Sequence, residues 1–258
     1  MEWKRKPGTW QMTEHTKKGV CYVSFPLLDA ERGFVHGFST RIGGVSEGDL
    51  SSMNLSFTRG DDPERVRENY RRIAAAVGFE TDRLVLTHQT HTNHVRVVTE
   101  ADAGKGFVRE RDYTDVDGLV TDVPQLVLTT FYADCVPLFF IDPVHRAIGL
   151  SHSGWRGTVS DIAAATVRTM QGEYGSRPEE LLVGIGPSIC QDCYEVSEDV
   201  IEEFRASYEE KLWMRLYREK GNGKYELNLW EACRQNLLRA GVLPDRIEVT
   251  DLCTCCNP

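Results

Sequence analysis

Three short apolar runs follow one another in the middle of the chain, and two reactive side chains stand at their ends. The runs cover residues 126–132, 136–141 and 147–150, and their lengths predict buried strands. Cys135 closes one apolar run, His152 closes the next, and glycines bend the backbone just beyond the histidine. Side chains at strand ends are held rigidly and still face solvent. This pattern favours a metal site or a nucleophile over a purely structural core.

Strands and helices mix along the rest of the chain without a regular βαβ rhythm. We predict further strands at residues 20–25, 34–38, 84–86, 95–98, 181–185, 225–229 and 247–249. We predict helices at 63–77, 158–174 and 230–240, and one or two helices over 199–216. Asp62 and Pro63 open the helix at 63–77, and Gly78 ends it. The charged segment 102–114 is the best candidate for a mobile surface loop. We therefore expect an α+β or irregular α/β fold, with mixed sheets flanked by helices, in one domain over residues 1–258.

Composition and charge exclude several classes of protein. The formal net charge of −9 over 258 residues argues against a nucleic-acid surface, because phosphate binding needs concentrated Lys and Arg. No apolar run approaches the roughly 20 residues that cross a bilayer, and the N-terminal residues lack the apolar segment of a secretory signal. We therefore expect a cytoplasmic protein without a membrane partner, present as a monomer or a homodimer.

His91, Cys135 and His152 form the strongest candidate constellation. Two imidazoles and a thiolate are ligands that zinc prefers, and three ligands leave a fourth position open for catalysis. On spacing alone, an equally good interpretation is a buried thiol with two unrelated surface histidines. The neighbouring His88 and His94 are better explained as exposed side chains or as partners of the backbone.

The eight cysteines favour free thiols or metal ligands over disulfides, since nothing in the sequence signals export. Cys190 and Cys193 form a C-x-x-C pair, and Cys253, Cys255 and Cys256 lie near the end of the chain. Together they have the composition of a structural zinc site. The gap between the two groups is, however, much longer than in compact zinc modules, so we interpret them as structural thiols.

Polar residues near glycine-rich bends are candidates for substrate contacts. Arg41, Asn54, Asp61 and Arg156 have the chemistry to hold a sugar hydroxyl, a phosphate or a purine edge. The alternative is that they satisfy turn backbone or pair at the surface. Trp155 has a flat ring that suits either stacking on a base or packing.

Six ordered motifs resemble those of the bacterial YfiH/YlmD family. They are residues 39–46 (STRIGGVS), 89–91 (QTH), 117–121 (DGLVT), 133–137 (ADCVP), 149–158 (GLSHSGWRGT) and 186–189 (GPSI). The resemblance implies a compact α/β domain of the YfiH-like, cysteine-hydrolase-like fold. It also implies a zinc site made of His91, Cys135 and His152, with these residues in the catalytic centre. The family usually continues past residues 251–254 into a strand with Ser and Arg residues, which leaves any substrate contact from that strand outside this sequence.

Members of this family have carried two kinds of functional label. The first is polyphenol oxidase or multicopper laccase. The second is purine nucleoside phosphorylase acting on adenosine, inosine or guanosine with phosphate, with adenosine deaminase and methylthioadenosine phosphorylase side activities. A laccase uses about ten histidines for its copper ions, more than the seven of this chain, although copper is able to occupy a zinc site adventitiously.

We therefore expect a zinc-dependent phosphorylase that uses Arg41, Asn54 and Arg156 as substrate contacts, with Arg41 or Arg156 on the phosphate. The alternatives are a metal-free Cys135/His152 thiol hydrolase such as an amidase, or a copper-dependent polyphenol oxidase.

Overall fold

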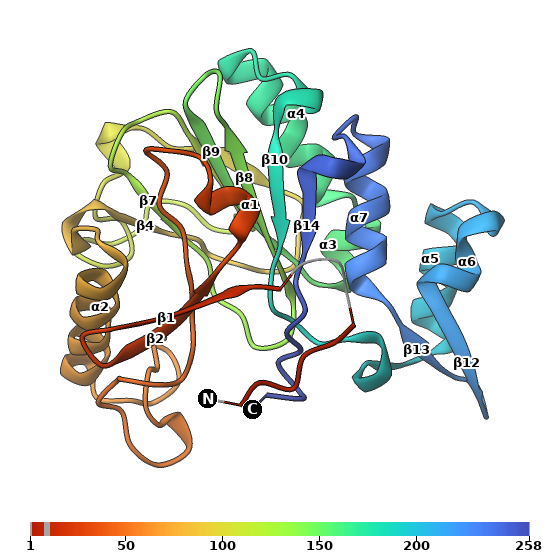
Figure 1. The fold of residues 1–258 in the computed structure, drawn as a ribbon, viewed down its shortest axis with the longest axis horizontal. Helices are drawn as coiled ribbons and strands as arrows, with labels where there is room; N and C mark the ends of the chain where they lie inside the picture. Colours follow the sequence, from red (N-terminus) through yellow and green to blue (C-terminus); the bar gives the residue numbers. More distant parts are fainter. Residues whose placement is uncertain (1, 8–10, 258) are drawn as a thin grey trace.

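A central six-stranded mixed sheet organises the molecule. The computed structural model describes residues 2–7 and 11–257, and Figure 1 shows the sheet at the centre of the ribbon. In order across the sheet the strands are β14 (Ile247–Val249), β10 (Leu182–Ile185), β8 (Val136–Asp142), β9 (Ala147–Ser153), β6 (Gly118–Thr121) and β5 (Val95–Val97). The outermost pair on each side is parallel, and the inner pairs are antiparallel.

The hairpin of β8 and β9 is the longest pairing in this sheet. Its register places Phe139 opposite Leu150 and Pro137 opposite His152. The turn closes on Asp142, whose buried carboxylate accepts the backbone N–H groups of Val144 and His145, both at 2.9 Å. Both strands are buried on both faces along nearly their whole length, as expected for strands covered on two sides.

Helices cover one face of this sheet. The helices of the chain are α1 (Pro26–Asp29), α2 (Pro63–Val77), α3 (Trp155–Val159), α4 (Ile162–Tyr174), α5 (Glu198–Ser207), α6 (Glu210–Leu216) and α7 (Leu229–Arg239). α4 packs on β9, β6 and β5, and α7 packs on β10 and β14. The largest apolar cluster lies between these helices and the sheet, where Phe140, Ile162 and Met170 are almost fully buried. Burial of such side chains stabilises the fold by roughly 2 kcal/mol each.

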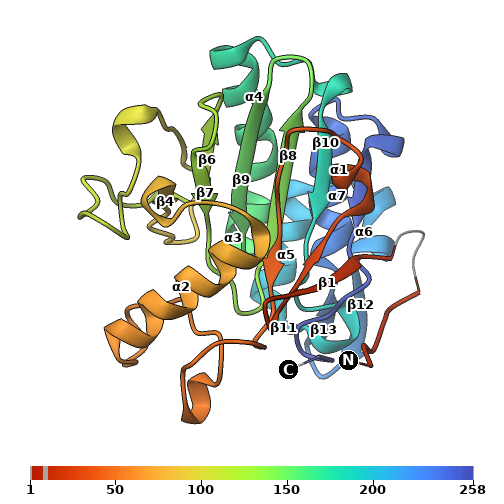
Figure 2. The same cartoon turned by 60° about the vertical axis from the view of Figure 1, so that its left-hand side comes forward.

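A second apolar cluster covers the opposite face. Phe25 and Leu28, around α1, pack there against Ile141 and Leu182 of the sheet. The chain before α1 forms a small antiparallel sheet of β1 (Thr13–Lys17), β2 (Val20–Ser24) and β3 (Phe38–Ser39). Figure 2, turned by 60°, shows α2 standing away from the central sheet on this side of the molecule.

Two smaller sheets complete the structure. One contains β11 (Glu195–Ser197), β13 (Lys224–Leu227) and β12 (Tyr217–Gly221), and the other pairs β4 (Leu84–Leu86) with β7 (Val127–Thr129). The β12–β13 hairpin lies beside α5 and α6 at one end of the molecule (Figure 1). The segments near the two ends of the chain lie side by side, because Arg5 pairs with Leu252 and the Lys6 N–H donates to the carbonyl of Asp251 at 2.7 Å.

The sequence predicted the mixed α/β class in a single compact domain, and the structure confirms it. The predicted helix at 63–77 is confirmed to the residue, with the Asp62 side chain accepting the Glu64 N–H at 2.9 Å and Gly78 ending it in a left-handed conformation. In the part of the chain that the structure describes, no helix combines the length and apolar character needed to span a membrane.

Two expectations were wrong in detail. The predicted helix at 158–174 begins earlier and is broken at Asp161, whose φ of 61° separates α3 from α4. The strand predicted at 34–38 is reduced to β3. The predicted loop at 102–114 contains no strand, and Asp102 and Lys105 in it are both buried and form an ion pair of 2.7 Å. Its mobility stays a prediction.

Candidate metal centre

Cys135 and His152 meet because β8 and β9 are antiparallel. Cys135 immediately precedes β8, and His152 is the second-last residue of β9. The start of one strand therefore lies at the same sheet edge as the end of the other, with Pro137 and His152 directly paired. Both side chains stand at strand ends, as the sequence indicated. Cys135 lies just before the start of β8, and His152 lies within the last two residues of β9.

His91 reaches this edge from the segment between β4 and β5. Its φ of 67° is unusual for a residue with a side chain. The carboxylate of Asp117 supports this conformation by accepting the backbone N–H groups of Thr90, His91 and Thr92, each at 3.0 Å. A backbone conformation of this kind persists where the surroundings hold it, and it is common at functional sites.

The donor atoms of His91, Cys135 and His152 converge. One donor atom from each residue lies within 4.8 Å of the others, and His91 Nε2 is 3.8 Å from Cys135 Sγ. The two imidazole rings meet edge to face, with their centroids 4.9 Å apart. His152 is buried while His91 is exposed, so one side of the cluster is open. The geometry can hold a single cation and leave a coordination position free.

Asp117 also orients His152. Its Oδ1 lies 2.8 Å from His152 Nδ1, which leaves Nε2 of the ring free to bind a metal ion. Burial alone would raise the pKa of this carboxyl, but the hydrogen bonds from His152 and from the Thr90 and Thr92 backbone outweigh it and lower the pKa to about 2. Sequence analysis assigned Asp117 no role beyond a motif position. The available signal was an acidic residue followed by Gly118 at the start of a strand.

The thiol and the exposed imidazole are both held in their neutral forms. Burial raises the pKa of Cys135 to about 11, and the carboxylates of Asp134 and Asp117 add to this effect. Burial and the neighbouring His152 lower the pKa of His91. A cation bound here would reverse the balance for the thiol, since metal ligation requires the thiolate and favours it.

His88 and His94 lie outside the cluster. His94 Nδ1 is 2.9 Å from the carbonyl of Asp115, and His88 Nδ1 accepts the Asp115 N–H at 3.2 Å. The prediction that these two rings serve the backbone is confirmed.

The three predicted substrate contacts have different environments. The Arg41 guanidinium donates to the carbonyls of Ser51 and Asp49, at 3.0 and 2.9 Å. Asn54 donates to the carboxylate of Asp61 at 2.8 Å and closes its own turn with Ser56. Both side chains, with Asp61, are therefore used within local structure, as the alternative interpretation proposed.

Arg156 is placed differently. Its side chain is exposed, and its guanidinium carbon lies 4.2 Å from the centre of the Trp155 ring. Its positive charge contributes to the lowered pKa of His91, after burial and the charge of His152. Arg156 is not among the residues that line the large cavity described next. Trp155 itself packs against the largest apolar cluster while offering a face to this guanidinium.

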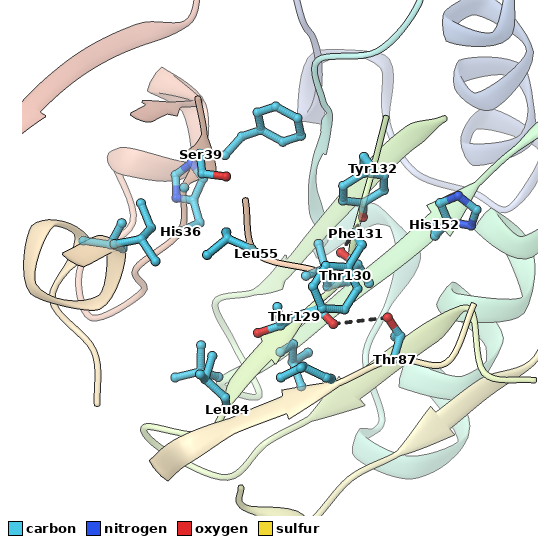
Figure 3. A pocket seen from close by; sticks show the side chains of 18 of the residues that line it. His36, Ser39, Leu55, Leu84, Thr87, Thr129, Thr130, Phe131, Tyr132 and His152 are labelled. Atoms are coloured by element: carbon cyan, nitrogen blue, oxygen red, sulfur yellow. Dashed lines mark hydrogen bonds between the residues drawn. The ribbon is translucent and has the colours of Figure 1, made fainter. Parts of the chain in front are cut away.

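A large cavity opens beside the three converging side chains. Its volume of about 2870 Å³ exceeds the roughly 300–1,000 Å³ of typical small-molecule sites. The lining includes His91, Cys135 and His152, together with the turns of Arg41 and Asn54. Figure 3 shows Tyr132 and His152 on one side of the cavity and His36 and Ser39 across from them. A substrate of nucleoside size has ample room here.

A second group of cysteines also converges, against our interpretation of separate structural thiols. The Sγ atoms of Cys190, Cys193, Cys253 and Cys256 all lie within 4.8 Å of one another. All eight cysteines of the chain are free. The long sequence gap between the two pairs is closed by the parallel alignment of β10 and β14, whose following segments run together.

Comparisons with known proteins agree with the fold and the motifs. The family described as multi-copper polyphenol oxidoreductase laccase matches residues 35–258. Purine nucleoside phosphorylase YlmD of Geobacillus stearothermophilus is 37% identical over 229 residues, covering 87% of this chain and 82% of that protein. A protein of an unknown prokaryotic organism named adenosine deaminase RL5 is 35% identical over 225 residues, covering 86% and 85%.

A solved structure, the Bacillus licheniformis hypothetical protein YfiH, superposes with a TM-score of 0.86 at 33% sequence identity, covering 93% of this chain and 88% of that one. The expected YfiH-like fold is confirmed. With its motifs, its fold and most of its length matched, the chain belongs to the laccase-like YfiH/YlmD family, the family described as multi-copper polyphenol oxidoreductase laccase.

Proposed function

We propose that this chain is a zinc-dependent purine nucleoside phosphorylase that cleaves adenosine, inosine or guanosine with phosphate. The observation that carries the proposal is the convergence of His91, Cys135 and His152, with donor atoms within 4.8 Å, at the edge of a cavity large enough for a nucleoside. The names of the relatives support purine nucleosides as the class of substrate.

The donor set fits zinc. Two imidazole nitrogens and one thiolate are borderline and soft ligands, and three protein ligands are the usual number in catalytic zinc sites. The hydrogen bond of 2.8 Å between His152 and Asp117 is the type of support that fixes a ligating imidazole. A bound zinc ion would supply Lewis-acid stabilisation of charge that develops on a coordinated reactant.

The reaction sets clear demands on the site. A phosphate oxygen forms a bond to the anomeric carbon while the bond from that carbon to the purine nitrogen breaks. The electron pair of the broken bond leaves with the base, which takes up a proton, and the products are ribose 1-phosphate and the free purine. The protein must therefore bind an anion, orient the ribose and exclude water that would compete with phosphate.

Arg156 is the best candidate for holding the phosphate. Its guanidinium is exposed and belongs to the helix that follows His152, whereas the Arg41 guanidinium already donates to two backbone carbonyls. A guanidinium binds phosphate oxygens through two parallel hydrogen bonds. Arg41 and Asn54 then shape the cavity wall through their turns, and any contact with the ribose would come from the outer surface of these turns.

A metal-free thiol hydrolase is the first competing function. The order Asp117, His152, Cys135 has the residue types of a cysteine protease triad. However, a nucleophilic cysteine needs a lowered pKa, while burial and two carboxylates raise the pKa of Cys135 to about 11. The Asp117 carboxylate, which lies 2.8 Å from His152 Nδ1, also gives His152 the support that a metal-ligating imidazole needs. These features favour a metal ligand.

Copper oxidase chemistry is the second competing function, since it is the description that the family carries. A multicopper enzyme places about ten histidines around its copper ions. This chain has seven histidines, and His88 and His94 bind backbone groups of Asp115. The histidines of this chain therefore suffice for one histidine-bound metal ion but not for a multicopper cluster.

Adenosine deamination and methylthioadenosine phosphorolysis belong to the proposal as side activities. The deaminase name of one relative supports the first of them. In a deamination, water attacks the purine carbon that carries the amino group and ammonia leaves. The cavity beside the cluster would admit the base as well as the ribose.

The test is a product assay under anaerobic conditions. Protein purified without added copper is given inosine and phosphate, and we expect hypoxanthine and ribose 1-phosphate in equal amounts. A chelator should abolish the release and added zinc should restore it. Phosphorolysis that continues after the metal has been removed would overturn the zinc dependence. No release of hypoxanthine by the zinc-loaded protein would count against the phosphorylase.

A further inference from the structure

The second group of cysteines has the arrangement of a metal site that is distinct from the proposed catalytic one. Cys190 and Cys193 follow β10, and Cys253 and Cys256 follow β14. Each pair has the spacing C-x-x-C, and all four Sγ atoms lie within 4.8 Å of one another. The fifth nearby cysteine, Cys255, is exposed and lies outside the group.

The sulfur spacing fits a tetrahedral ion better than a disulfide. Cys193 Sγ and Cys256 Sγ are 3.6 Å apart. Four thiolates at about 2.3 Å from a central zinc ion would lie roughly 3.8 Å from one another. A disulfide requires a sulfur separation of about 2.05 Å. The four thiols are thus close to the positions that one ion would require.

Backbone hydrogen bonds hold the two segments together around the sulfurs. The Cys190 N–H donates to Cys253 Sγ at 3.2 Å, and the Cys193 N–H donates to the Cys190 carbonyl at 3.1 Å. The Thr254 N–H donates to the carbonyl of Ser188 at 3.1 Å. N–H groups aimed at sulfur stabilise a thiolate, and this support surrounds ligands in built metal sites.

A positive charge lies beside the cluster. The Lys6 ammonium is 3.1 Å from a carboxylate oxygen of Asp192, which lies between the two cysteines of the first pair. Four thiolates around a divalent cation carry a net charge of −2. The ammonium offsets part of this charge.

We propose that Cys190, Cys193, Cys253 and Cys256 bind a zinc ion as a closed structural site. Four protein ligands leave no position for water or substrate, so this ion would take no part in turnover. It would instead join the segment after β14 to the segment after β10. The Thr254 hydroxyl donates to the Asp134 carboxylate at 2.7 Å, and the Ile189 N–H donates to the Asp134 carbonyl at 3.0 Å. The structural ion would therefore stabilise the residue next to Cys135.

The first test keeps all four cysteines. Cys135→Ala protein, purified without added metal, should retain about one zinc ion per chain with four sulfur ligands at about 2.3 Å in X-ray absorption spectra. A first coordination shell that contains nitrogen, or protein without zinc, would overturn the proposal. Because this variant has lost the proposed catalytic ligand, the result does not depend on whether the chain is a phosphorylase.

The second test removes the cluster. The double substitution Cys190→Ser/Cys193→Ser should lower the zinc content of the full chain by about one ion, and Cys255→Ser should leave it unchanged. Equal zinc in the two proteins would count against the site. A thiol titration of unfolded protein, prepared without reductant, should find eight free thiols after the zinc is removed. Four fewer thiols would show that the cluster forms two disulfides instead.

Discussion

The two groups of side chains that we propose as metal ligands differ in composition, in exposure and in the way the fold assembles them. The group of His91, Cys135 and His152 mixes nitrogen and sulfur, has an exposed member and faces a cavity. The group of four cysteines is all sulfur and is held between two chain segments. The difference follows a general rule, since an ion with a free position can bind substrate and an ion enclosed by four ligands stabilises structure.

The two groups also depend on different interactions. The ligands of the first group come from a tight hairpin and from a turn that the Asp117 carboxylate holds in place. Those of the second group come from the ends of two parallel strands that the central sheet aligns. Asp134 connects them, because it precedes Cys135 and accepts the Thr254 hydroxyl. Substitutions in the first group should therefore change catalysis, and substitutions in or near the second group should change the stability of the fold.

The largest effect is expected from Cys135→Ala. Turnover should fall by about 10³-fold or more, because the substitution removes a ligand from the ion that would stabilise developing charge. Steady-state phosphorolysis of inosine and zinc content measure the two effects in one preparation. Cys255→Ser is the matched control, since it removes an exposed thiol near the four-cysteine cluster and should leave both values unchanged. If Cys135→Ala retained its turnover, the first group could not be a catalytic metal site, and the contrast between the two groups would fail.

Asp117→Asn should have the next largest effect. The amide cannot supply two anionic oxygens to His152 and to three backbone N–H groups, so zinc affinity and kcat/KM should each fall about 10- to 100-fold. Competition with a coloured chelator measures the affinity. Asp115→Asn changes a nearby exposed carboxylate and serves as the control. Unchanged affinity in Asp117→Asn would show that the carboxylate supports the backbone alone.

Gly154→Ala tests the close approach within the first group. A Cβ atom at Gly154 would lie 2.7 Å from His91 Cδ2 and 3.1 Å from Cys135 Sγ, so both ligands must move. We expect activity to fall about tenfold with little change in the unfolding temperature. Gly172→Ala in α4 meets nothing within 4 Å and is the control. A Gly154→Ala protein with normal activity would mean that the ligand positions tolerate displacement.

Glu248→Gln tests the stability of β14, the strand that precedes Cys253 and Cys256 of the second group. Burial raises the pKa of Glu248, in β14, to about 7, so its carboxyl holds a proton more tightly in the folded chain than in the unfolded chain. The stability of the wild type should therefore fall as pH rises from 4.5 towards 7. The amide removes this dependence and should stabilise the chain by about 1 kcal/mol at pH 8.

Denaturant unfolding at pH 8 and at pH 4 measures the effect of Glu248→Gln, and the gain should vanish at the lower pH. Zinc content should stay unchanged, which would separate the stability of β14 from metal binding at either group. A loss of stability in Glu248→Gln at pH 8 would show that the ionised carboxylate stabilises the folded chain, against this prediction.

Local patterns in the sequence predicted much of the fold. The cap at Asp62, the proline after it and Gly78 fixed the limits of α2, because caps and breakers act within a few residues. The exposed edge strands β1 and β12 were missed, since their charged and polar residues lack an apolar pattern. The break at Asp161 was also missed, since it depends on a single backbone conformation.

The amino-acid sequence alone was enough to predict the side chains of the first group, the limits of the strongest elements and the family. Residue chemistry and short-range periodicity carry this information. Three features became visible in the folded chain alone: Asp117 serves both His152 and the turn of His91, Arg41 is occupied by its own turn, and four distant cysteines meet. Such contacts depend on strand register and on the pairing of distant segments, which a linear pattern does not specify.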